Sequence, residues 1–99
     1  MKFYGTMICP DTVYADKVLR KNGIDIEYID ITANTANLKE FLAIRDSRNE
    51  FDIKREQGKI GVPLFLLDDG KITFDVYEIE GVNEQIEESD NKQGMCKIF

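Results

Sequence analysis

The chain has 99 residues, 42% of them hydrophobic and 32% charged, which is typical of one small globular domain and too apolar for a disordered chain. It contains no histidine and two cysteines, which excludes Ser/His/Asp and Cys/His nucleophile systems, zinc sites that use histidine, and four-cysteine metal sites within one chain. The formal net charge of −6 argues against nucleic-acid binding driven by electrostatics.

The first part of the chain predicts a strand followed by a helix. Residues 2–6 are short and aromatic, which suits a strand. A helix is expected from Pro10, whose ring fits the first helical position, to Asn22, and Gly23 is expected to end it.

A second strand and a second helix are expected next. Residues 24–31 alternate, which predicts a strand with one face formed by Ile24, Ile26 and Tyr28 and the other by Ile29 and Ile31. Asn34 or Thr35 can cap the helix, whose apolar stripe consists of Leu38, Phe41 and Leu42.

The remaining elements are expected to be short. They are a helical piece over 51–57 ended by Gly58, a strand over 62–67, a turn at Asp69-Gly70, a returning strand over 71–74 and a short helix over 76–80. The order β-α-β-α-β-β-(α) indicates an α/β domain with a mixed four-stranded sheet and flanking helices. Its first two strands should be parallel and its last two antiparallel.

Charge and hydropathy predict the domain boundary and the compartment. Residues 75–99 hold 7 acidic and 2 basic side chains, so we expect a domain over 1–80 and an acidic polar tail over 81–99. The N-terminal segment lacks the apolar stretch of a signal peptide, and no run of about 18 apolar residues occurs. The expectation is a cytoplasmic protein with reduced thiols.

Cys9 is the main candidate for chemistry. It lies between a strand and a helix start, where backbone N–H groups favour a thiolate, the reacting form in disulfide exchange. Thr12 occupies the position of the second cysteine in a dithiol protein; its hydroxyl either donates to the Cys9 thiolate or has no chemical role. Val62 and Pro63 suggest a cis-proline beside the thiol that presents the Val62 backbone to an extended substrate.

Three motifs together resemble the glutaredoxin branch of the thioredoxin-fold superfamily: Phe3-Tyr4-Gly5-Thr6, Cys9-Pro10-Asp11-Thr12 and Gly61-Val62-Pro63. The likeness covers about residues 2–79 and is greatest to small bacterial glutaredoxin-related proteins with a Cys-Pro-Asp-Thr motif. It implies a thioredoxin-like fold and Cys9 as the nucleophile. The residues that it implies for substrate binding are Pro10, Val62 and Pro63.

The chain departs from glutaredoxins at Thr6, where they usually carry lysine, and over 73–77, where they use a Gly-Gly pair to hold glutathione. It also lacks the Gly-Phe-Ser that follows the cysteine in members carrying iron–sulfur clusters. We therefore expect no metal and no tightly bound cofactor, with glutathione as a candidate co-substrate.

Two further features each have two interpretations. Cys96 is either a bystander in the tail or a resolving thiol that reaches Cys9. A group of basic side chains interleaved with acidic ones is either a solvated helix face or includes one or two arginines that bind a carboxylate, such as that of glutathione, at the site rim. The group consists of Arg45, Arg48, Lys54, Arg55 and Lys59.

Together these features predict a monothiol-type thiol–disulfide oxidoreductase, in which Cys9 forms a mixed disulfide that an external thiol resolves. The expected partners are a disulfide-containing protein or a glutathione mixed disulfide, with no nucleic acid and no membrane. The alternative is a thioredoxin-fold binding or redox-sensing module without turnover.

Overall fold

The computed structural model describes residues 1–82, so Cys96 and nearly all of the expected tail lie outside the described residues. The strands are β1 (Lys2–Gly5), β2 (Glu27–Asp30), β3 (Leu64–Leu66) and β4 (Ile72–Thr73). The helices are α1 (Pro10–Lys21), α2 (Thr35–Ser47) and α3 (Asp52–Glu56), with short 3₁₀ turns η1 (Asn49–Phe51) and η2 (Val76–Glu78).

The four strands form one mixed sheet in the order β2-β1-β3-β4. β1 pairs in parallel with β2 across the α1 crossover and antiparallel with β3, and β3 pairs antiparallel with β4. The predicted α/β class, the mixed sheet, the parallel first pair and the antiparallel hairpin are confirmed.

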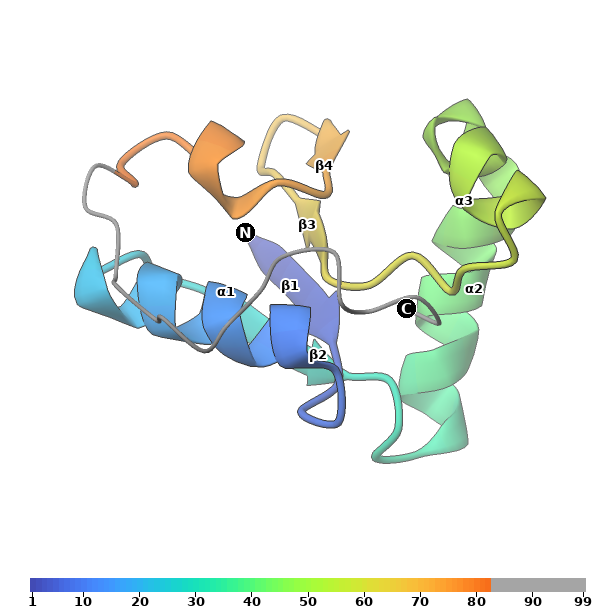
Figure 1. The fold of residues 1–99 in the computed structure, drawn as a ribbon, viewed down its shortest axis with the longest axis horizontal. Coiled ribbons are helices and arrows are strands. Elements are labelled where there is room, and N and C mark those ends of the chain that lie inside the picture. Colours follow the sequence, from blue (N-terminus) through green and yellow to red (C-terminus); the bar gives the residue numbers. More distant parts are fainter. Residues whose placement is uncertain (83–99) are drawn as a thin grey trace.

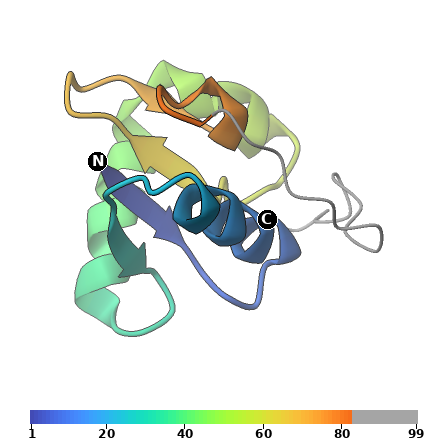
Figure 2. The same ribbon diagram turned by 90° about the vertical axis from the view of Figure 1, so that its left-hand side faces the viewer.

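Helices cover both faces of the sheet (Figure 1), with α1 in front of the sheet in Figure 2 and α2 and α3 behind it. The α1 side contains the core cluster Phe3, Ala15, Val18, Leu19, Phe65, Val76 and Ile79. The α2 side contains Tyr4, Ile29, Ile31, Phe41, Phe51, Val62 and Leu64. The alternation predicted for residues 24–31 is therefore confirmed, because Ile29 and Ile31 face α2 while Tyr28 packs on the α1 side. Within residues 1–82 no helix has both the length and the apolar character needed to cross a membrane.

The helix ends follow the local sequence. Pro10 is the first residue of α1, and the chain turns away at Gly23, whose φ of 67° is favourable only for glycine. Of the two candidate caps of α2, Asn34 is the one used: its Oδ1 accepts a hydrogen bond of 2.8 Å from the Asn37 N–H.

Several elements are shorter than expected. β2 covers four of the eight residues of its alternating segment, and the last helical piece is only the 3₁₀ turn η2. β3 begins at Leu64, since Pro63 has no N–H to donate to a strand ladder. Leu38 was expected in the buried stripe of α2, but 37% of its surface is exposed. Phe41, another residue of that predicted stripe, is fully buried, with its ring against Tyr4 and Phe51.

Candidate functional site

Three loop segments meet at one end of the sheet. β1 and β2 are parallel, so Gly5 lies beside Asp30 where both strands end, while β3 begins there because Leu64 is opposite Tyr4. The Ile31 N–H continues the pairing by donating to the Gly5 carbonyl at 3.0 Å. The segments 6–9, 31–32 and 61–63 are therefore neighbours, and they include Cys9, Val62 and Pro63.

Thr6 anchors the loop that carries the cysteine. Its side chain is buried, and its Oγ1 lies 2.9 Å from Oγ1 of Thr32, in the segment that follows β2. Its carbonyl accepts a 3.0 Å hydrogen bond from the Cys9 N–H. The residue type that departs from the glutaredoxin pattern therefore has a structural role here, since a lysine could not form the same short hydroxyl contact.

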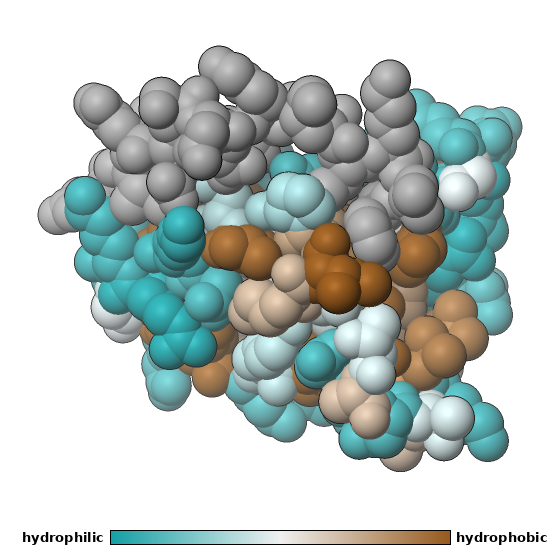
Figure 3. Space-filling model, turned by 60° about the horizontal axis from the view of Figure 1, so that its bottom comes forward, coloured by the Kyte–Doolittle hydropathy of each residue, from teal (hydrophilic) through white to brown (hydrophobic). Residues whose placement is uncertain are grey.

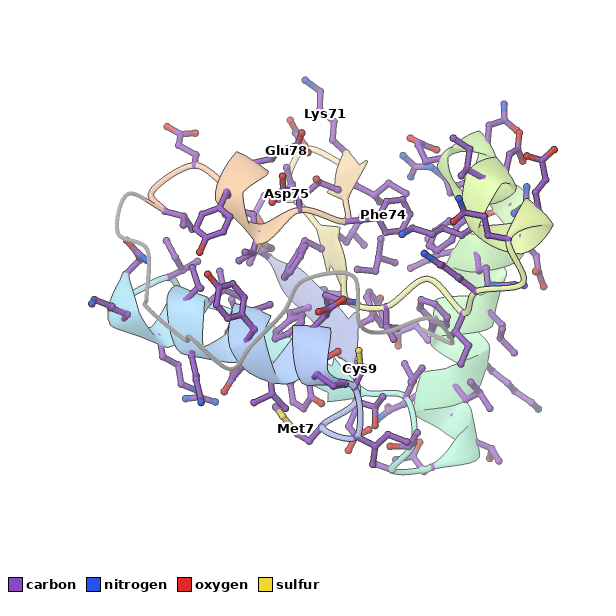
Figure 4. All side chains as sticks on the ribbon, in the orientation of Figure 1. Met7, Cys9, Lys71, Phe74, Asp75 and Glu78 are labelled. Carbon is purple, nitrogen blue, oxygen red and sulfur yellow. The ribbon has the colours of Figure 1, made fainter. Side chains whose placement is uncertain are left out.

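Cys9 is the N-cap residue of α1, with extended backbone angles of φ −96° and ψ 119°. Its thiol is free of any disulfide and makes no capping hydrogen bond to the helix. The dipole of α1 favours negative charge at its N-terminus, where Cys9 lies. The side chain has 0% of its surface exposed and points inward, while Met7 lies on the outer side of the same loop (Figure 4).

Thr12 lies one turn into α1 and packs against Gly5 of β1. A Cβ atom built on Gly5 would be 2.6 Å from Cγ2 of Thr12, so the helix and strand backbones approach closely at this point. The Thr12 hydroxyl is fully buried and has no hydrogen-bond partner in the described part of the chain. The predicted hydrogen bond from this hydroxyl to the Cys9 sulfur is therefore absent from the structure.

The segment before β3 contains the expected cis peptide bond between Val62 and Pro63. Gly61 precedes it with φ 102°, and a Cβ at Gly61 would be 2.6 Å from the ring of Phe51, so only glycine fits. Val62 is 5% exposed, and within residues 1–82 neither its N–H nor its C=O takes part in a hydrogen bond. A buried main chain without partners is unusual.

Arg45 of α2 holds this segment in place. Its Nε donates to the Ile60 carbonyl at 2.9 Å and its Nη2 to the Lys59 carbonyl at 3.1 Å. Arg55 donates in turn to the carbonyl of Arg45 at 2.5 Å, and Arg48 pairs with Glu50. The suggestion that arginines of this group bind a ligand carboxylate is not supported, because these three guanidinium groups already bind groups of the chain itself.

The described surface includes an apolar groove and a more open hollow. An apolar groove of about 510 Å³ lies beside the site, between α2 and the segments that flank the sheet end; it is lined by Ile31, Thr32, Leu38, Leu42, Arg45 and Ile60 among others. A shallower hollow of about 470 Å³ involves Phe74, Asp75 and Glu78, which lie at the end of the molecule opposite Cys9 in Figure 4. Among the described residues no group of histidine, cysteine or acidic side chains is arranged to hold a metal ion.

Comparison with known proteins identifies one relative. A protein of Haemophilus influenzae, described as uncharacterized, is 35% identical over 72 residues, which are 73% of this chain and 84% of the relative. The chain belongs to the family of this protein. No family model and no solved structure matches the chain. Because the relative's description assigns no activity, the function has to be argued from the site.

Proposed function

We propose that the chain is a monothiol-type thiol–disulfide oxidoreductase with a thioredoxin-like fold, in which Cys9 is the nucleophile. One juxtaposition carries the proposal: a cysteine outside any disulfide, at the start of α1, shares the sheet end with the main chain of Val62, which has no hydrogen-bond partner within residues 1–82. The first group supplies a sulfur in a position that favours the thiolate. The second supplies a donor and an acceptor with which an extended segment can pair.

Further support comes from the way both groups are fixed. The Cys9 loop is tied to the segment after β2 through Thr6 and Thr32, and the Val62 segment is tied to α2 through Arg45. A site whose parts are held by independent contacts loses little conformational entropy when a substrate binds. The resemblance of the Cys-Pro-Asp-Thr and Gly-Val-Pro motifs to glutaredoxins points to the same chemistry.

The reaction has two exchange steps. The Cys9 thiolate attacks one sulfur of a substrate disulfide, a bond forms between Cys9 and that sulfur, and the other sulfur leaves as a thiolate that takes a proton from water. An external thiol then attacks the sulfur that is bonded to Cys9, so a disulfide forms between these two sulfurs and Cys9 leaves as a thiolate. The sulfur released in the first step is the one that is reduced, and the external thiol is oxidised into the new disulfide. Glutathione is a candidate for this thiol, and Thr12 cannot replace it because a hydroxyl does not displace a thiol. We place the reaction in a reducing compartment such as the cytoplasm.

One observation favours the second candidate, a redox-sensing or binding module without turnover. The Cys9 side chain has no exposed surface, so a disulfide reaches the sulfur only after neighbouring atoms move. In a sensor, that slow access would limit Cys9 to occasional reversible modification. Turnover distinguishes the two functions, since a sensor forms an adduct but does not cycle.

The test is reduction of hydroxyethyl disulfide by glutathione, followed with the wild-type chain and with Cys9→Ser and Cys96→Ser. We expect steady turnover that disappears in Cys9→Ser and persists in Cys96→Ser, the matched control for loss of a cysteine. A single stoichiometric adduct on Cys9 without turnover would favour the sensor, and no reaction at Cys9 would contradict both functions.

A further inference from the structure

We propose that the exposed Met7–Ile8 pair selects disulfides flanked by apolar residues of a protein segment, and that small anionic disulfides such as those of glutathione are poor substrates. The inference rests on the proposed function of Cys9 and adds its substrate class. Ile8 is the principal specificity-determining residue, because it directly precedes Cys9.

The first observation is the exposure of this pair on a loop that is held in place. Ile8 is 71% exposed, the highest value among the large apolar side chains described. Met7 is 45% exposed, which is one of the three highest values. The loop is anchored on both sides of the pair, by the buried Thr6 and by the hydrogen bond from the Cys9 N–H to the Thr6 carbonyl. Single exposed apolar side chains are common, but these two adjoin the nucleophile in a fixed loop.

The second observation is that apolar surface continues from this loop across the site. Thr32, which contacts Thr6 through its hydroxyl, also lines the apolar groove, together with Leu38 and Ile60. In Figure 3, which brings this end of the molecule toward the viewer, hydrophobic side chains gather in the middle of the face with hydrophilic ones around them. A substrate segment bound at Cys9 would therefore have two apolar neighbours: Ile8, on the loop of the nucleophile, and the groove, which lies beyond the contact of Thr6 with Thr32.

The third observation is the distribution of charge. A glutathione moiety carries carboxylates that need cationic partners, but Arg45 and Arg55 donate to backbone carbonyls and Arg48 is paired with Glu50. The carboxylate nearest to the nucleophile in sequence is Asp11, in the first turn of α1. The remaining cations of the basic group are Lys54 and Lys59, and Asp11 lies within electrostatic range of Lys54 and offsets part of their charge. The exposed apolar pair is therefore the feature that favours an uncharged segment, and Lys59→Gln tests the anionic alternative.

The experiment uses three probes that share one disulfide and one leaving group. They are mixed disulfides of thionitrobenzoate with a Leu-Cys-Leu peptide, with a Glu-Cys-Glu peptide and with glutathione. Attack of Cys9 on the peptide sulfur breaks the bond to thionitrobenzoate, which leaves as a coloured thiolate while the peptide stays on Cys9. Single-turnover rates are measured in the full chain carrying Cys96→Ser, so that the second cysteine does not contribute.

We expect the apolar probe to react about tenfold faster than either anionic probe, the effect of partly burying one aliphatic side chain. Ile8→Ser should remove this preference by slowing the apolar probe alone, and Met7→Ser should do so partially. Ile53→Ser is the matched control, because Ile53 is 63% exposed on α3 and should leave all three rates unchanged. Lys59→Gln should not slow the glutathione probe, because we expect no basic side chain to bind the carboxylates of glutathione.

Each of the other outcomes would overturn the substrate class, the proposed function or both. Equal rates for the three probes, or an Ile8→Ser effect shared by all of them, would overturn the substrate class while leaving Cys9 as the nucleophile. If the glutathione probe reacts fastest and Lys59→Gln slows it, the apolar substrate class is wrong and the site binds anionic substrates. If no probe reacts faster than with Cys9→Ser, the proposed function fails and the substrate class fails with it.

Discussion

Gly5 and Thr12 are in direct contact where α1 crosses β1, and the Thr12 side chain occupies the space that a Cβ of residue 5 would need. Gly5→Ala should therefore lower the free energy of unfolding by about 1–3 kcal/mol, the usual cost of overpacking. Chemical denaturation followed by circular dichroism measures this change. Thr12→Ala in the same chain should restore part of the loss, because it removes both Cγ2 and Oγ1. A double variant with the sum of the two single losses would contradict the contact.

The hydroxyl groups of Tyr4 and Tyr28 differ in whether they have a hydrogen-bond partner among the described residues. The Tyr4 hydroxyl donates to Oε2 of Glu40 at 2.5 Å, whereas the Tyr28 hydroxyl is buried with no hydrogen-bond partner among the described residues. Tyr4→Phe should destabilise the fold by about 1–2 kcal/mol, while Tyr28→Phe should be neutral or stabilising because it removes an unpaired polar group. Burial accordingly raises the pKa of Tyr28 to about 12. Thermal unfolding of the two variants provides the comparison, and equal losses would show that Tyr28 has a partner.

The hydrogen bond between Tyr4 and Glu40 makes part of the free energy of unfolding depend on pH. The hydrogen bond from Tyr4, followed by one from Lys2, lowers the pKa of Glu40. A group with a lower pKa in the folded state stabilises above its unfolded pKa of about 4.3, and this contribution is lost as pH falls through the folded pKa. The destabilisation caused by Tyr4→Phe should therefore be larger at pH 7 than at pH 3. Because the Glu40 carboxylate is largely exposed, the difference should be small.

Arg45 provides a test of how the Val62 segment is held. Arg45→Met keeps most of the aliphatic stem but leaves the carbonyls of Lys59 and Ile60 without their donors, which should cost about 2 kcal/mol. Amide hydrogen exchange at Lys59, whose N–H donates to the Lys54 carbonyl at 2.8 Å, should accelerate more than exchange in α1. Uniform acceleration over the whole chain would instead indicate a general loss of stability.

The fate of the mixed disulfide concerns Cys96, which lies outside the described residues. Protein oxidised on Cys9 and freed of small thiols should keep its adduct, since the Thr12 hydroxyl cannot displace it and an external thiol is the proposed resolving agent. Intact mass measurement over several hours checks this, and Cys96→Ser should behave identically. Loss of the adduct with formation of a Cys9–Cys96 disulfide would instead assign the resolving role to Cys96.

The elements that sequence patterns predict well are those with both a periodic core and a stop signal. α1 begins at Pro10 and is followed by Gly23, both as expected, and its buried face carries a stripe that includes Ala15 and Leu19. Strand lengths were overestimated, because an apolar segment such as residues 62–67 does not reveal which of its residues find a ladder partner.

The contacts that shape the candidate site were missed for a different reason. Arg45 binds the carbonyls of residues 59 and 60, and Gly61 accommodates the ring of Phe51, but these partners are distant in sequence and leave no local pattern. Cys9 is indicated by its place between a strand and a helix start, and Val62-Pro63 by its pairing with that helix start, and the resemblance to a family supports both. The burial of Cys9 had no signal in the sequence, since it depends on packing that a local motif does not specify.

The position of β1 in the middle of the sheet has a consequence for synthesis on the ribosome. β1 is made before both of its neighbours, which are β2, more than twenty residues later, and β3, which starts only at Leu64. Phe3 and Tyr4 therefore emerge long before the residues that cover them, and one side of the strand keeps unpaired backbone groups until most of the chain has left the exit tunnel. Such a nascent chain is exposed to misassociation until β3 arrives, and chaperones that bind short aromatic segments have their target at its first residues.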